Sequence, residues 1–234
     1  MPDLKYAASD SLDLDAYIAT PSGEGPWPGV VVVMDALGMS DDIKGIADRF
    51  AANGYLAFAP NLYSGRGIKC VVATLAASRS GSGEAYDHIE SARKLLVARE
   101  DCTGKVGIIG FCMGGGFAVL STPRFDFAAA SVNYGEVPGD AVNKLVGACP
   151  IVASYGKRDK TLPNRAARLE SALTTLGVAH DVKEYPNAGH SFMNKVSVGP
   201  LKPALHFLGF DFVEDANEDS WSRILAFFAT HVAA

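Results

Sequence analysis

GKVGIIGFCMGGGFA, residues 104–118, joins an apolar run to a glycine-rich turn. The run 105–111 is predicted as a buried strand, and a helix is predicted to begin at Met113. Gly110, Cys112 and Gly114 have the spacing G-x-C-x-G, which is the outline of a nucleophile elbow with cysteine in place of serine. The competing interpretation is a glycine-rich turn of a nucleotide-binding unit, in which Cys112 has no chemical role. The dinucleotide fingerprint fits poorly, because it needs an early turn and an acidic residue about 20 positions later.

An elbow of this kind holds its central side chain above the sheet in a strained backbone conformation. Strand and helix pack closely there, so small residues are needed on both sides, and Gly110 and Gly114 meet this need. The N-terminus of the following helix directs free N–H groups and the positive end of its dipole at Cys112. Such a place stabilises a thiolate.

The rest of the chain alternates predicted strands with predicted helices. Strands are predicted at 5–10, 12–21, 28–35, 55–63, 127–135 and 149–159, and from 179 into a loop that ends at His190. Helices are predicted after the cap Ser40 as far as Asn53, and at 84–99, 163–176 and 219–233. Residues 65–83 are predicted as a loop region, with a short helix at 71–77 as the alternative. This order predicts an α/β protein with a mostly parallel central sheet and helices on both faces.

The composition of the chain limits the number of domains and the kinds of partner that we expect. The chain has 234 residues, of which 48% are hydrophobic, and this predicts one domain over residues 1–234. A net charge of −5 gives no reason to expect nucleic acid or an anionic membrane as a partner. We find no apolar run of about 18 residues that would span a membrane, and no secretory signal layout, so a cytoplasmic location is expected.

The cysteines and histidines are too scattered for a metal site. We therefore expect no metal and no cofactor, and free thiols in a reducing compartment. The cysteines are Cys70, Cys102, Cys112 and Cys149.

A thiol nucleophile needs a base, and the base needs an orienting group. In sheets of this type the chain order is nucleophile, acid, histidine, and Cys112, Asp159 and His190 follow it. Asp159 comes after a predicted strand and just before a predicted helix, so capping of that helix is the alternative role. His190 lies in the loop sequence NAGHSF, where packing gives little reason for a histidine.

An oxyanion hole needs two backbone donors. One is expected from the N–H of Met113, the residue after the predicted nucleophile, and the other from Ala36 in the loop MDALG. Asp35 ends the preceding strand and is predicted to hydrogen-bond the thiol or to accept a proton. Its alternative role is a turn aspartate that caps local N–H groups.

These residues resemble the dienelactone hydrolase family, a branch of the α/β-hydrolase fold. The resemblance covers most of the chain, through VVVMDALG, NGYLAFAPNLY, GKVGIIGFCMGGGFA, GKRD and NAGHSF. It implies an α/β-hydrolase fold and hydrolysis of an ester or enol-lactone through a thioester on Cys112, as in a carboxymethylenebutenolidase. It also implies His190 as base, Asp159 as its partner, and a monomer without metal; a homodimer is the alternative.

The sequence departs from the family pattern at three places. Asp35 stands where the family usually has glutamate. Asn194 stands where a member acting on dienelactone has an arginine for the substrate carboxylate, and the adjacent Lys195 is predicted to substitute for it. The segment 63–83, in which the family's second arginine falls, looks shorter and different here, and Arg79 is the candidate for a second substrate-binding cation. The hydrolase class therefore carries over better than dienelactone as the substrate.

Two other functions remain open at the level of sequence. The first is a non-catalytic small-molecule binding protein with the hydrolase fold. The second is a redox sensor on Cys112, in which another cysteine would resolve the oxidised thiol. The apolar segment 196–215 is interpreted as core packing, with a pocket wall or a partner surface as alternatives.

Overall fold

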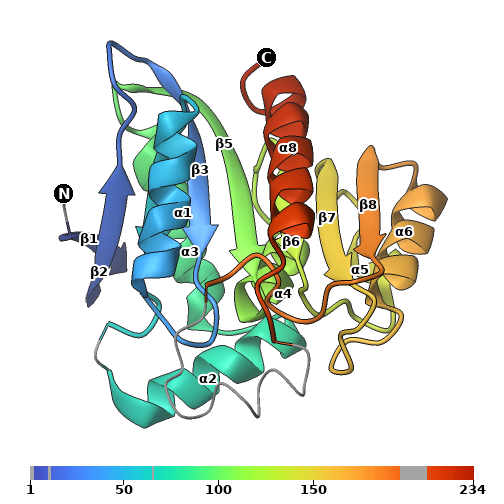
Figure 1. Cartoon of the computed structure of the whole chain (residues 1–234). Helices are drawn as coiled ribbons and strands as arrows, with labels where there is room; N and C mark the ends of the chain where they lie inside the picture. Colours follow the sequence, from blue (N-terminus) through green and yellow to red (C-terminus); the bar gives the residue numbers. More distant parts are fainter. Residues whose placement is uncertain (1–2, 10–11, 65, 196–209) are drawn as a thin grey trace.

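The apolar runs 30–33 and 106–109 are neighbours at the centre of an eight-stranded sheet in the computed structural model (Figure 1). The structure describes residues 3–9, 12–64, 66–195 and 210–234. The strands are β1 (Asp3–Ser9), β2 (Leu12–Ala19), β3 (Trp27–Val33), β4 (Leu56–Pro60), β5 (Cys102–Phe111), β6 (Ala130–Asn133), β7 (Ile151–Gly156) and β8 (His180–Tyr185). The valines of β3 are fully buried, as expected of a strand that is covered on both faces.

The strand order is β1-β2-β4-β3-β5-β6-β7-β8. β1 pairs antiparallel with β2, and β2 pairs antiparallel with β4, while the neighbours from β4 to β8 are parallel. This confirms the mostly parallel sheet that the sequence predicts. The carboxyl ends of the parallel strands share one edge, where sites collect in open sheets of this kind.

Helices cover both faces of this sheet. They are α1 (Asp41–Ala52), α2 (Gly67–Ser80), α3 (Glu84–Val97), α4 (Met113–Ser121), α5 (Ala141–Lys144), α6 (Arg165–Leu176) and α8 (Glu214–His231). On one face, Phe50 of α1 contacts the rings of Trp221 and Phe228 of α8 at 5.2 and 5.7 Å. On the other, Tyr86 of α3 meets Phe117 of α4 edge to face at 4.9 Å. These aromatic contacts tie neighbouring helices together over the sheet.

The prediction of a loop at 65–83 is wrong, because α2 occupies most of that segment. The alternative helix at 71–77 lies inside it. The buried residues of α2 are small, namely Thr74, Ala77 and Ser78. They let α2 lie close to α4, although α2 has no apolar stripe. A helix held by small residues has no strong 3.6-residue pattern, so the sequence suggested a loop. In Figure 1, α2 lies beyond the carboxyl ends of the parallel strands.

The last helix starts at Glu214 rather than Asp219, and α5 was not predicted. Of the apolar segment 196–215, residues 196–209 lie outside the described residues. Where the description resumes, the Val213 N–H donates to the Phe192 carbonyl at 3.0 Å.

Candidate active site

The glycine-rich turn after β5 is as tight as its sequence predicts. Cys112 stands between β5 and α4 with φ 54° and ψ −113°, a conformation that is strained for any residue with a side chain. A Cβ on Gly110 would lie 1.9 Å from the Gly114 carbonyl oxygen, and one on Gly114 would lie 2.3 Å from the Val33 carbonyl oxygen. The turn therefore requires glycine at both positions, and Cys112 is left partly exposed at its tip.

Two later loops bring Asp159 and His190 together at the same edge of the sheet. Asp159 follows β7 and His190 follows β8, so the parallel order of these strands makes their loops neighbours. A Cβ on Gly156 would lie 2.4 Å from the Gly189 carbonyl oxygen, so the loops are in close contact. The Arg158 N–H also donates to the Ala188 carbonyl at 2.9 Å.

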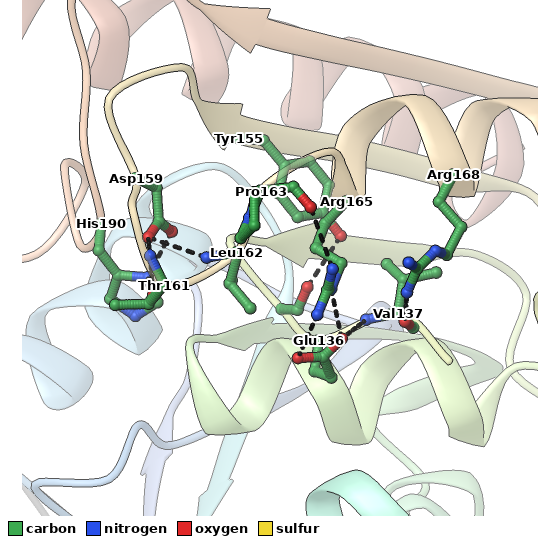
Figure 2. Close-up of polar contacts among 11 residues, drawn as sticks. Glu136, Val137, Tyr155, Asp159, Thr161, Leu162, Pro163, Arg165, Arg168 and His190 are labelled. Atoms are coloured by element: carbon green, nitrogen blue, oxygen red, sulfur yellow. Dashed lines mark hydrogen bonds and ion pairs between the residues drawn. The ribbon is translucent and has the colours of Figure 1, made fainter. Parts of the chain in front are cut away.

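The side chains of Asp159 and His190 are buried and hydrogen-bonded to each other. The Nδ1 of His190 lies 2.6 Å from Asp159 Oδ2. The other carboxylate oxygen, Oδ1, accepts bonds from the N–H and the hydroxyl of Thr161 at 2.8 and 2.6 Å (Figure 2). The Leu162 N–H adds a third bond at 3.3 Å. Asp159 thus holds both the imidazole and its own loop. The alternative of a helix cap is wrong, because Asn164 precedes α6 as its N-cap and the N–H groups that Asp159 accepts belong to the loop before it.

The loop that carries Asp159 is fixed at its far end as well. Arg165 begins α6, and its Nε lies 2.5 Å from Glu136 Oε1, which belongs to the loop after β6 (Figure 2). Arg168 donates to the Val137 carbonyl at 3.0 Å, and the Tyr155 hydroxyl donates to the Gly135 carbonyl at 3.1 Å. Such support limits the freedom of a reacting side chain.

The pKa values of His190 and Asp159 show that the imidazolium is favoured in this site. Burial alone would lower the pKa of His190, but hydrogen bonds to Asp159 and Cys112 and their negative charges raise it to about 9. Burial alone would raise the pKa of Asp159, but the bond and charge of His190, with the bonds from Thr161, lower it. The site therefore holds a histidine that is hydrogen-bonded to Asp159 and whose pKa responds to Cys112, the predicted nucleophile.

We expect an Asp159→Asn variant to lower the pKa of His190 from its value of about 9. An amide removes the charge that favours the imidazolium, and burial then pulls the pKa down, by about 1–3 units. The ring proton signals of His190 followed by NMR against pH will measure this. A midpoint that stays near that of the wild type would contradict the assignment of Asp159 as its partner.

Asp35 is a buried turn aspartate at the end of β3. Its Oδ1 accepts the Leu37 N–H at 2.8 Å, and its backbone carbonyl accepts the Gly38 N–H at 3.2 Å. The second bond fixes the peptide unit that also contains the Ala36 N–H. Burial raises the pKa of Asp35, the Asp42 charge adds to this, and the Leu37 N–H and the His190 charge oppose it. The capping role considered for Asp35 is therefore present, close enough to His190 for their charges to interact.

The structure explains Asn194 differently from the sequence. The side chain is buried, its Oδ1 accepts the Tyr134 hydroxyl, and its Nδ2 donates to Asp42 Oδ2 at 2.5 Å. The ring of Tyr134 lies 5.3 Å from the ring of His190. The hydrogen bonds that join Tyr134, Asn194 and Asp42 therefore hold in place an aromatic ring that packs against the histidine. Tyr134 and Asp42 were missed, because an aromatic residue after a strand reads as ordinary core and an aspartate early in a helix reads as a cap.

The two candidate substrate cations lie in different places. The Lys195 ammonium lies 4.9 Å from the centre of the Phe212 ring, and Lys195 lines a pocket with residues of α1 and α8. Arg79 is exposed in the last turn of α2. The described lining of the Lys195 pocket includes neither Cys112 nor His190. A role in substrate binding stays a prediction for both.

Three further findings concern the surroundings of the site and the helices of the protein. The ring of Phe210, at the described end of the apolar segment, lies 4.7 Å from the ring of His190. Within the described ranges, no cluster of three or more histidine, cysteine or acidic side chains is arranged to hold a metal ion. No helix among the same residues has the length and apolar character needed to cross a membrane.

A sheet of this topology, with an elbow followed by an acid and a histidine at its carboxyl edge, defines an α/β hydrolase. Residues 14–232 match the dienelactone hydrolase family model. A Yersinia pestis protein provisionally named carboxymethylenebutenolidase is 29% identical, over 94% of this chain and 84% of its own length. One with the same provisional name from Methylorubrum extorquens is 32% identical, over 81% of this chain and 71% of its own.

Solved structures agree with these relatives. A Klebsiella pneumoniae crystal structure, provisionally titled a dienelactone hydrolase, has a TM-score of 0.79 and 25% identity, covering 97% of this chain and 98% of its own. The chain belongs to the dienelactone hydrolase family. It is therefore a hydrolase of the ester and lactone class.

Proposed function

We propose that this chain hydrolyses esters and enol-lactones of small molecules through a thioester formed on Cys112. One observation carries the proposal. His190 is hydrogen-bonded to Asp159 at 2.6 Å, and its pKa is raised by both Asp159 and Cys112, which stands on the strained turn at the N-terminus of α4. This is the relation that nucleophile, base and orienting acid must have in acyl transfer.

In the first half of the reaction, the Cys112 thiolate attacks the carbonyl carbon and a carbon–sulfur bond forms. The Ala36 and Met113 N–H groups stabilise the oxyanion. The adduct then collapses and the bond to the leaving oxygen breaks. The His190 imidazolium gives its proton to that oxygen, and an acyl-thioester remains on Cys112.

The second half of the reaction, hydrolysis of the thioester, depends on a change in the pKa of His190. Acylation converts the Cys112 thiolate into a neutral thioester, so one of the two charges that hold the pKa of His190 near 9 disappears. Burial and Asp159 remain, and the pKa falls. His190 is then able to take a proton from water, which attacks the thioester and releases the acid and the thiolate. The change in charge on sulfur thus switches the histidine from acid to base.

The choice of cysteine limits the substrates. A thiolate attacks well but also leaves well, so an adduct with a poor leaving group returns to the starting ester. We therefore propose substrates with stabilised leaving groups: enol esters and enol-lactones, aryl esters and thioesters. In this proposal Asp35 keeps the oxyanion turn in shape through its bond to Leu37 and adds negative charge near His190.

The test is to capture the acyl-enzyme. Wild-type protein is mixed with a panel of aryl esters and enol-lactones, quenched in acid within its first turnovers, and digested for mass spectrometry. We expect the mass of the acyl group on the peptide that contains Cys112, together with product. Protein whose Cys112 has been blocked with iodoacetamide is expected to be inactive. Turnover at the wild-type rate by the blocked protein would overturn the proposal, and binding without turnover would favour the non-catalytic alternative.

A further inference from the structure

Tyr63 follows β4, and its hydroxyl lies between the two segments proposed to stabilise the oxyanion. The hydroxyl is 3.1 Å from the Ala36 carbonyl oxygen, to which it donates, and 3.6 Å from the sulfur of Met113. Ala36 belongs to the turn after β3, and Met113 is the first residue of α4. One side chain thus spans both sides of the proposed oxyanion hole.

The backbone of Tyr63 is itself held in place. Asn61 Oδ1 accepts the N–H groups of Tyr63 and Ser64, each at 3.1 Å. The Tyr63 carbonyl accepts the Arg66 N–H at 2.9 Å. On its other side the ring packs against Gly38, where an added Cβ would lie 3.1 Å from the ring carbon Cδ2. The hydroxyl therefore approaches Ala36 from a fixed base.

The hydroxyl keeps its proton, and remains a donor, at neutral pH. Burial, then the negative charges of Asp35, Cys70 and Cys112, raise the pKa of Tyr63 to about 12. A protonated phenol keeps its hydrogen bond to the carbonyl, and it is close enough to Cys112 for the charge on the sulfur to act on it.

The bonds inside the turn do not by themselves place it relative to α4. The bonds from Leu37 and Gly38 both end on Asp35, so they fix the shape of the turn. Tyr63 adds a bond from outside, at the peptide next to the Ala36 N–H, and contacts the side chain of the residue that bears the second N–H. Two oxyanion donors must lie within a few tenths of an ångström of their working positions.

We propose that Tyr63 is a positioning residue for acyl transfer, which sets the spacing between the Ala36 and Met113 N–H groups through its hydroxyl. The inference rests on the proposed function. It predicts that the hydroxyl matters for steps in which an oxyanion forms, and is irrelevant to steps in which the thiolate reacts without one.

The test compares two reactions of Cys112 in a Tyr63→Phe variant of the full chain. Hydrolysis of an activated aryl ester passes through an oxyanion. Alkylation by iodoacetamide displaces iodide at a saturated carbon and forms none. The variant keeps the ring against Gly38 and loses only the hydroxyl. We expect kcat for the ester to fall about 10- to 100-fold with KM nearly unchanged. The alkylation rate and its pH profile are expected to match those of the wild type.

Tyr6→Phe is the matched control, because the Tyr6 hydroxyl also donates to a backbone carbonyl, that of His88 at 3.2 Å, and belongs to β1. We expect it to leave kcat unchanged. Equal losses of ester hydrolysis and alkylation in Tyr63→Phe would overturn the inference, because they would place the effect on the thiol or on the fold. An unchanged kcat would overturn it too. If the wild type does not turn over esters, the proposed function is refuted, and this inference with it. If the wild type is active, an unchanged kcat in Tyr63→Phe refutes only this inference.

Discussion

Replacing Cys112 with alanine is expected to lower the hydrolysis of activated esters by about 10⁴-fold or more, because no other group can form the thioester. Cys112→Ser tests the chemistry more finely. A serine hydroxyl ionises far less readily than a thiol, and the proposed site is arranged around a thiolate, so this variant should bind substrate but turn over slowly. Steady-state rates on one aryl ester, with KM measured for each variant, will check both expectations.

Cys149→Ala serves as the control for loss of a thiol. Burial raises the pKa of Cys149 to about 12, and the residue lies just before the amino end of β7, at the opposite edge of the sheet from the site. Its replacement is expected to leave the rate unchanged. Wild-type activity in Cys112→Ser would contradict the proposal that this site depends on a thiolate.

Gly110→Ala is expected to destabilise the fold by about 3 kcal/mol or more, the largest effect of any single methyl group in the turn. The added Cβ would lie 1.9 Å from the backbone oxygen of Gly114 and 2.8 Å from the Gly115 nitrogen. Backbone atoms at the start of α4 cannot move aside without opening the crossing of β5 and α4. The midpoint of urea unfolding, with the yield of folded protein, measures the loss.

Gly45→Ala is the control for this change. A Cβ on Gly45, within α1, would meet nothing within 4 Å. Alanine favours a helix over glycine by up to about 1 kcal/mol, so this variant should be as stable as the wild type or slightly more so. A Gly110→Ala variant that unfolds at the wild-type midpoint would show that the turn is looser than described.

The central part of the fold could be predicted from the sequence because its signals are local. The β-branched run of β3 and the run of β5 are long enough to identify buried strands, and the helix after Ser40 has a cap and an apolar face. α2 could not be predicted in this way, because its packing depends on small side chains against α4. What a small residue contacts is decided by another element, and no periodicity within 67–80 records it.

The candidate site was predictable to the extent that chain order carries chemistry. Asp159 and His190 could be chosen because each follows a predicted strand, and parallel strands bring such residues to one edge. Tyr63 and Asn194 could not. The Tyr63 hydroxyl reaches a carbonyl 27 positions earlier, and Asn194 pairs with an aspartate 152 positions away. These contacts depend on how loops pass one another, which single-sequence patterns do not encode.

The backbone at Cys112 sets two demands on this protein against each other. A residue with a side chain at φ 54° and ψ −113° costs folding free energy of about 1–3 kcal/mol, which glycine would largely avoid. Selection for durability alone would therefore remove the thiol from this position. A lineage that no longer used the chemistry would gain stability through the same substitution that ended it. We therefore expect Cys112 to be retained only while selection for its reaction is stronger than selection for higher folding stability.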